Sequence, residues 1–340
     1  MTDLRPPRRL PAALASLSGL VLVAAGGCAT DGGSPATAEA GITGPELAVR
    51  PMARPEPTFG TRDAWARRGD PALGRFDLPT SIDPARVAEL RAVSVDLLVR
   101  AAGSNVPLLR ANALEALAAE PQRLLPAVRL GLGDENRGVR FTAVMMVGRE
   151  RITPLAPLVE PLLADPSGSV RAAAIYALSR CGRPVDPTPL AGMLLGESLE
   201  ERGNAAMVLG MLGEDSALDL LRSAYGRTVP TAGGNALRAV DMQIAEAAYR
   251  LGREAEDLEL IRAALLASGG EEEIAALAAQ ICGELRDEAS LRTLAWIATR
   301  NEAPENQPPA PAEVRMAAAT AIARMRPDQA PVRVLMGYIG

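Results

Sequence analysis

The sequence predicts an all-α protein, an α-solenoid of about seven helical hairpins, from three observations. Small or aliphatic residues recur at fixed distances after an anchor residue, and most of the anchors recur about every 31 residues. An apolar helical segment precedes each of these anchored segments. Aromatic residues make up only 3% of the chain, so the core must be built mainly from Ala, Leu, Val and Met, which suits closely packed helices.

The second helix of each predicted hairpin carries the anchor. After Arg110, for example, small or aliphatic residues follow three, six and seven positions later, at Ala113, Ala116 and Leu117. These positions share one face of a helix, and small residues there allow a neighbouring helix to approach closely. In chain order the anchors are Arg110, Arg140, Arg171, Arg202, Ile244, Ala275 and Arg315.

The first helix of each hairpin is predicted from an apolar segment that precedes the anchor. Turns rich in Gly, Asp and Pro, such as Gly131 to Asp134 and Asp165 to Gly168, separate the two helices and supply helix ends. The predicted first helices are Val87 to Arg100, Gln122 to Leu132, Leu155 to Ala164, Leu190 to Leu195, Ala217 to Tyr225, Leu258 to Leu266 and Ser290 to Thr299.

The turns also carry a motif. Asp134 to Arg140 reads D-x-x-x-x-V-R, Asp165 to Arg171 reads the same, and Val314-Arg315 repeats its end. This resembles the HEAT-like repeat superfamily, in particular the short bacterial form also found in phycobilin lyases, over residues 81–340. The resemblance is specific for fold and nearly silent on function.

In that superfamily the aspartate and the arginine form a ladder between successive repeats. The resemblance therefore implies a structural role for a set of polar residues, and it implies an interruption of the ladder in the carboxy-terminal half, where Ile244 and Ala275 replace arginine. The implied ladder residues are Asp134, Arg140, Asp165, Arg171, Arg202 and Arg315.

The amino terminus, residues 1–27, has the pattern of an export signal. Three arginines precede the apolar run from Leu10 to Ala25, and Gly26, Gly27 and Cys28 follow it. The cysteine after small residues resembles the bacterial lipobox, although Ala25 stands where leucine is usual. We therefore expect lipid attachment at Cys28, with cleavage after a later A-x-A at Ala38 to Ala40, or an uncleaved anchor, as the alternatives.

A lipidated cysteine would make this a membrane-anchored lipoprotein of the cell envelope. The periplasmic face of the outer membrane is favoured over the inner membrane. The reason is that Asp31 lies beyond the positions just after the cysteine that usually govern retention in the inner membrane.

Residues 28–80 are rich in Gly, Pro, Ala and Thr and are predicted to be a flexible linker. Within it, Phe59, Trp65 and Phe76 lie among arginines in the segment 59–76. This segment is either an amino-terminal cap on the first repeat or a short linear motif that binds a partner, and the cap is favoured because terminal repeats must be covered.

Two long anchor spacings place loop insertions near 226–235 and 301–311. Both fall in the turn between the first and second helix of a hairpin. They should therefore emerge on the same edge of the solenoid, either bordering a binding surface or as insertions that exposed turns tolerate.

Composition restricts the function. The chain has no histidine and, by inspection, no lysine, which excludes His-based triads, lysine Schiff bases and the P-loop lysine. Its net charge of -5, with interspersed signs, does not predict nucleic-acid binding. We expect no metal and no cofactor.

The remaining candidates for catalysis are carboxylates, densest at Glu200-Glu201 and Glu271-Glu272-Glu273. Each group sits at the start of a predicted second helix, where the helix dipole already favours negative charge. The sequence therefore predicts a non-catalytic scaffold or assembly factor that binds an unidentified protein of the envelope. A carboxylate-dependent envelope hydrolase is the alternative.

Overall fold

The computed structural model describes residues 84–229, 233–299, 310–329 and 331. The predicted export signal, Cys28, the linker and the aromatic segment 59–76 lie outside these residues. So does most of the second predicted insertion, at 300–309.

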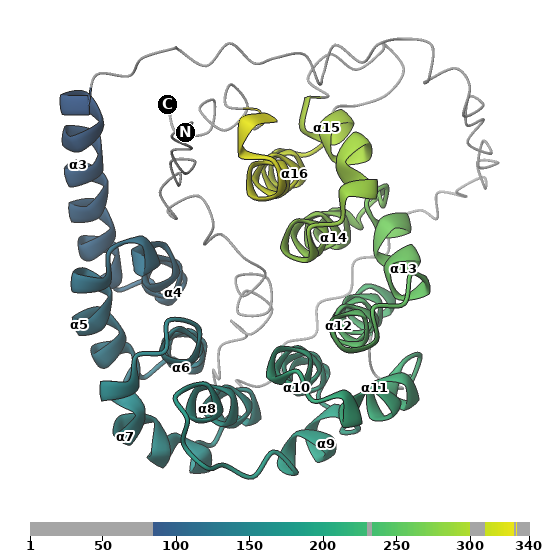
Figure 1. Ribbon diagram of the computed structural model, residues 1–340, viewed down its shortest axis with the longest axis horizontal. Coiled ribbons are helices and arrows are strands. Elements are labelled where there is room, and N and C mark those ends of the chain that lie inside the picture. The colour runs from purple at the N-terminus through teal and green to yellow at the C-terminus, as the bar shows by residue number, and fades with distance from the viewer. Residues whose placement is uncertain (1–83, 230–232, 300–309, 330, 332–340) are drawn as a thin grey trace, which may run out of the picture.

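In the described part of the chain, helices form two layers around an open ring (Figure 1). The outer helices are α3 (Pro84–Ala102), α5 (Pro121–Gly131), α7 (Ala156–Val159), α9 (Pro189–Leu194), α11 (Leu218–Ala224), α13 (Glu256–Ala264) and α15 (Leu291–Thr299). The inner helices are α4 (Pro107–Ala116), α6 (Arg137–Arg149), α8 (Gly168–Arg180), α10 (Leu199–Leu212), α12 (Gly234–Gly252), α14 (Glu272–Leu285) and α16 (Ala312–Met325).

Each outer helix and the inner helix that follows it form one hairpin, and successive hairpins stack around the ring. The predicted fold class, an all-α solenoid, is therefore confirmed. Short 3-10 turns join several of the helices, at Leu117–Ala119, Thr153–Leu155, Glu160–Ala164, Asp215–Ala217 and Glu288–Ser290, and another, Pro327–Gln329, follows α16.

Local sequence explains where many of the helices begin and end. Proline occupies the first turn of α4, α5 and α9, where the missing N–H has no intrahelical acceptor in any case. The Asn136 side chain accepts from the backbone N–H groups of Gly138 and Val139 and so caps α6. At the other end, Gly213 takes a left-handed conformation with φ of 79° and ends α10.

The outer segment Leu155 to Ala164, predicted as one helix, is broken into a 3-10 turn, the four-residue α7 and a second 3-10 turn. Pro154, Pro157 and Pro161 cause the break, because each lacks the N–H that a continuous helix would use. The apolar residues keep the helical period in this segment, but the prolines limit the α-helix to a single turn.

The hydrophobic core lies between the two layers and is divided at α12. Ile244 and Ala247 belong to a cluster that extends back through α10, α8 and α6 to α4. Met242 and Ala245 belong to a second cluster that extends forward through α14 to α16. Residues on different faces of α12 thus belong to different hydrophobic cores.

Glycine brings three pairs of inner helices into close contact. A Cβ added at Gly148 in α6 would lie 2.9 Å from the Cα of Ala177 in α8. Gly210 in α10 and Gly283 in α14 stand in the same relation to Ala247 in α12 and Ala321 in α16, at 2.7 Å and 2.8 Å. These distances are too short for any side chain, so α6–α8, α10–α12 and α14–α16 are close junctions that require glycine.

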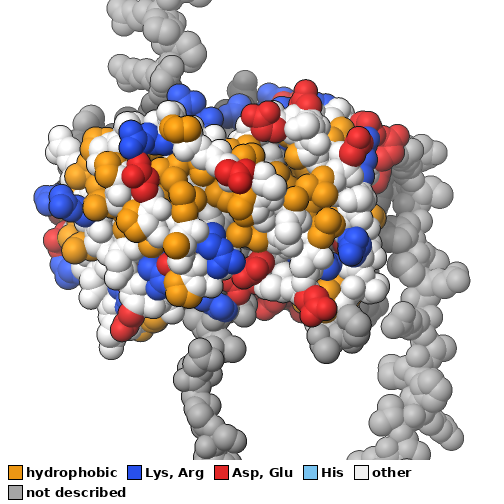
Figure 2. All heavy atoms as spheres, turned by 90° about the horizontal axis from the view of Figure 1, so that it is seen from below, with side chains coloured by type: hydrophobic (Ala, Val, Ile, Leu, Met, Phe, Trp, Pro, Cys, Tyr) orange, Lys and Arg blue, Asp and Glu red, His pale blue; other side chains and the backbone are white. Residues whose placement is uncertain are grey.

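The outer surface carries side chains of mixed type. Figure 2, seen from below the view of Figure 1, shows hydrophobic side chains in a broken band between charged groups of both signs. Among the described residues, no helix combines the length and the apolar character needed to cross a bilayer.

Candidate interaction surface

Two of the arginine anchors form two-pronged ion pairs with the aspartate of the following repeat. Arg110 donates from Nε and Nη2 to Asp134 at 2.8 and 2.7 Å, and Arg140 donates in the same way to Asp165 at 2.8 and 3.0 Å. Each arginine also donates to the backbone carbonyl of the residue six positions earlier, Ser104 for Arg110 and Asp134 for Arg140. These bonds tie the turn of one repeat to the turn of the next.

The next anchors bond to carbonyl groups instead. Arg171 donates to the carbonyls of Asp165 and Pro166, and Arg202 donates to those of Gly196 and Arg227. Gly196 stands where the ladder aspartate would be expected for Arg171, 25 residues after it in the sequence. Arg315, the last anchor, begins the second turn of α16.

An arginine–aspartate pair also occurs in the carboxy-terminal half, but on the opposite edge of the solenoid. Arg262 in the outer helix α13 donates to both oxygens of Asp287 at 2.9 and 2.6 Å. Asp287 follows α14, in the turn between two repeats. The D-x-x-x-x-V-R motif could not reveal this pair, because the arginine lies on a first helix and outside the motif.

The carboxylates of Glu200 and Glu201, the first candidates for catalysis, form hydrogen bonds to the helices of preceding repeats. Glu201 accepts from the backbone N–H of Gly168 at 3.1 Å, and Glu200 accepts from the hydroxyl of Ser169 and from Arg137. Both contacts lie at the amino-terminal ends of α6 and α8, where negative charge is favoured. The two glutamates therefore join α10 to the neighbouring repeats.

The second acidic group, Glu271 to Glu273, is divided between different roles. Glu271 accepts from Arg238 of α12 at 2.6 Å, and Glu272 accepts from the backbone N–H of Gly270. The Glu273 side chain is exposed on the first turn of α14. Arg238 was not recognised from the sequence, since it stands six residues before the anchor Ile244.

The first predicted insertion, near 226–235, is partly helical. Residues 230–232 are outside the described part, but α12 begins at Gly234, ten residues before Ile244. Because α6 and α8 begin three residues before their anchors, the added length extends α12 by seven residues, about two turns. Asn235 in this extension donates to the carbonyl of Gly270, 3.0 Å away.

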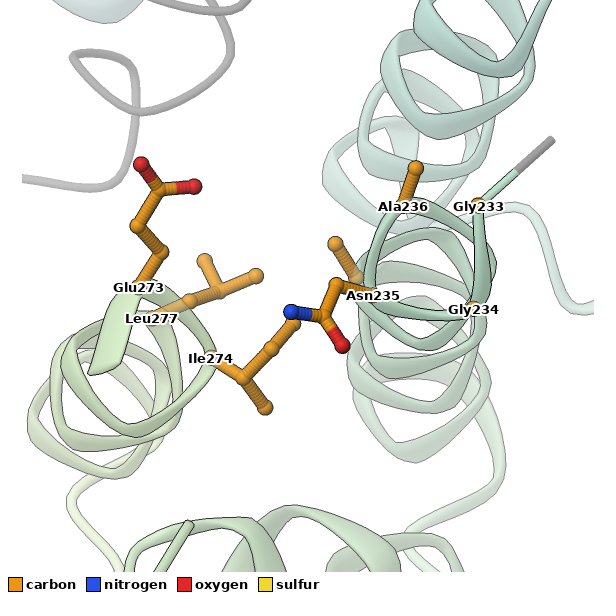
Figure 3. A pocket seen from close by; sticks show the side chains of 8 residues that line it. Gly233, Gly234, Asn235, Ala236, Glu273, Ile274 and Leu277 are labelled. Carbon is orange, nitrogen blue, oxygen red and sulfur yellow. The ribbon is translucent and has the colours of Figure 1, made fainter. Parts of the chain in front are cut away.

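The extension of α12 lines a cavity of about 540 Å³ between α12 and α14 (Figure 3). Its floor is apolar, with the buried side chains of Ile274 and Leu277. Asn235 and Glu273 lie at its rim on opposite helices. Gly233 and Gly234 at the start of α12 also line it. The cavity can hold one apolar side chain beside a carboxylate that favours a basic neighbour.

Residues 95–179 match the family model described as HEAT repeats. Among solved structures, the chain is similar to human deoxyhypusine hydroxylase in complex with glycerol, at 18% sequence identity and a TM-score of 0.36, over 75% of this chain and 94% of that one. No curated protein matches the sequence. The matched repeats run from α3 to α8, the part of the solenoid that contains both two-pronged ladder pairs.

Proposed function

We propose that this protein is a non-catalytic interaction scaffold of the bacterial cell envelope, tethered through a lipid on Cys28. The cavity between α12 and α14 supports the scaffold function most directly. It presents buried apolar side chains, Ile274 and Leu277, beside the exposed carboxylate of Glu273. The partner is a protein segment that inserts an apolar side chain there and places a basic residue against Glu273.

The binding site can be tested by site-specific photocrosslinking in membranes. A photoreactive residue at Asn235, on the rim of the cavity, should give a discrete adduct. The same residue in place of Leu130, which is 80% exposed on the outer helix α5, serves as the control. We expect the adduct at the rim only.

Two rim substitutions make this test specific. Ala236→Trp should fill the cavity and Glu273→Arg should reverse the charge at its rim, and each should abolish the adduct at Asn235 while the helical content stays unchanged. An adduct that persists in both variants, or that forms equally at Leu130, would disprove the cavity as the binding site.

The lipid tether is supported by the order of charge, apolar run and small residues before Cys28. The intact mass of protein extracted from membranes should correspond to a chain that begins at Cys28 and carries a diacylglycerol and an amide-linked acyl chain. Cys28→Ser should remove both the added mass and the membrane association. A mass that begins after Ala40 would refute the tether and leave the scaffold proposal to the crosslinking result.

The contacts of the acidic residues favour a scaffold over a carboxylate-dependent hydrolase. Glu200, Glu201 and Glu271 each accept a hydrogen bond from the neighbouring repeat. Substitution of these residues by glutamine should therefore lower the melting temperature without removing any turnover. A hydrolytic activity that disappears in Glu200→Gln while the fold is intact would reverse this assignment.

A further inference from the structure

Charged side chains converge on the concave side of the ring, near the carboxy-terminal ends of the inner helices. Four of them stand nine residues after the anchor of their helix: Arg149, Arg180, Glu284 and Arg324. Glu115 and Tyr176 stand five residues after their anchors, one helical turn earlier. Equivalent positions of successive repeats share a face, so these side chains point into the same space.

Arg149 of α6 is at the centre of this group. It lies within electrostatic range of Glu115 in α4 and of Arg324 in α16, and it also acts on Tyr176 in α8. Tyr176 is only 3% exposed, and burial raises the pKa of its hydroxyl against the opposing effect of Arg180, Arg149 and Arg250. Residues from the first, second, third, fifth and last repeats thus share one electrostatic environment.

The positive charges in this group are only partly compensated. Arg250 of α12 is paired with Glu246 and with Glu284 of α14, and Arg324 is paired with the same Glu284. No carboxylate of the described part forms an ion pair with Arg149 or Arg180. The Nε of Arg180 is buried and has no acceptor.

Glu115 does not supply the missing negative charge. Its side chain is 2% exposed, and neither carboxyl oxygen has a hydrogen-bond partner among the described residues. Burial raises the pKa of Glu115 to about 8, with Glu284 adding to the effect and Arg149 and Arg324 opposing it. At neutral pH the group is therefore mainly a protonated donor with no acceptor in the structure.

We propose that Arg149, Arg180 and the hydroxyl of Tyr176 bind an oxyanion, the carboxylate or phosphate group of a small molecule, and that Glu115 donates to it. Two guanidinium groups on adjacent helices offer the forked donors that such oxygens bind. Helical side chains lean toward the amino terminus, which places both arginines over the preceding turn, away from the negative ends of α6 and α8. The bound oxyanion satisfies the buried Nε of Arg180 and the orphaned carboxyl of Glu115.

Calorimetric titration of the full-length protein tests this site. Inorganic phosphate and malonate are titrated separately at pH 7, with sodium chloride adjusted to keep the ionic strength constant. We expect saturable binding of one equivalent of at least one of the two, and the one that binds identifies the oxyanion. The absence of saturable binding by both would overturn the proposal.

Variants locate the binding. Arg149→Gln and Arg180→Gln should each weaken it about tenfold, and the double variant should abolish it. Arg129→Gln, at an exposed arginine on the outer helix α5, should bind as the wild type does. If Arg149→Gln does not fold, Arg149→Lys keeps the charge without the fork and should still bind about tenfold more weakly. Unchanged binding in the double variant would mean an adventitious ion only and would refute the site.

The pH dependence tests the role of Glu115. Malonate affinity should fall as the pH rises past about 8, because an ionised Glu115 would repel the ligand. Glu115→Gln keeps a donor and cannot ionise, so its affinity should stay constant over the same range. Parallel pH profiles for the wild type and Glu115→Gln would remove Glu115 from the site.

Discussion

The two neighbours of α12 contact it in different ways. Toward α10, Ala247 packs against Gly210 so closely that a Cβ on the glycine would lie 2.7 Å from the Cα of the alanine. Toward α14, the contacts include the ion pair between Arg250 and Glu284 and a cavity of about 540 Å³. One junction is close-packed, and the other combines an ion pair with an open cavity.

This difference shows how a repeat protein divides its tasks. The close junction depends on small residues and dispersion contacts, which leave no room for a ligand. The other junction leaves an apolar floor accessible and has charged side chains beside it, and the proposed binding of a partner depends on both features. The two hydrophobic cores meet within α12, so the solenoid should open most readily beside this helix.

The largest expected effect is a dependence of the free energy of unfolding on pH. It arises at Glu115, which lies within electrostatic range of Glu284 in α14. The pKa of Glu115 is raised from 4.5 to about 8 in the folded chain, so the unfolded chain binds fewer protons between these values. The free energy of unfolding should therefore fall by about 5 kcal/mol as the pH rises through this window. Urea unfolding of the wild type and of Glu115→Gln measures it. The variant should show a smaller fall, and the part that remains comes from Glu246, because burial raises the pKa of that carboxyl to about 7.

The close junction itself has no titratable group between Gly210 and Ala247 and should contribute no pH dependence. Identical pH slopes for the wild type and Glu115→Gln would show that Glu115 is not the source of the effect.

Ala247→Leu should destabilise the protein by about 3 kcal/mol. Ala247 is 1% exposed and faces Gly210, so added carbon atoms can only be accommodated by separating α10 from α12. Thermal and urea unfolding measure the loss. A stability within about 0.5 kcal/mol of the wild type would mean that the junction is not close-packed in solution.

Arg250→Ala should cost about 2 kcal/mol, because it leaves Glu246, with an 11% exposed side chain, without its cation. The double variant Arg250→Ala, Glu246→Gln should recover part of the loss by removing the uncompensated charge. A double-mutant cycle gives the coupling energy between the two residues. If the stability losses of the two single variants simply add up in the double variant, Arg250 and Glu246 do not stabilise each other.

Ala239→Leu should have the smallest effect and the opposite sign. Ala239 lines the cavity between α12 and α14, where a larger side chain can cover the apolar floor, and we expect a gain of about 0.5 kcal/mol. It makes the same chemical change as Ala247→Leu on the same helix, so it is the matched control for that variant. Equal losses in the two variants would remove the distinction between the two junctions.

Much of the local structure could be predicted from the sequence, because helix period, proline position and turn composition act over a few residues. The anchors at Arg140 and Arg171 place α6 and α8 correctly, and the fold class follows from their repetition. The broken outer segment around α7 shows the limit of that argument, since three prolines override an otherwise helical period.

Contacts between distant repeats could not be predicted in this way. Arg238 lies outside the repeated motif, and its bond to Glu271 depends on the amino-terminal extension of α12, which carries it. The cavity depends on the same extension and on the distance between α12 and α14, which no spacing in the sequence encodes.

By itself, the sequence determined the repeat, most of the helices and the small or aliphatic residues on the packing face of each second helix, because these depend on periodicities of a few residues. Only the tertiary structure decided that Glu115 of the first repeat lies near Glu284 and Arg324 of the last two. Small rotations between successive hairpins add up around the ring, and their sum brings together side chains more than 160 residues apart in the sequence. The charge group on the concave side is therefore a consequence of curvature.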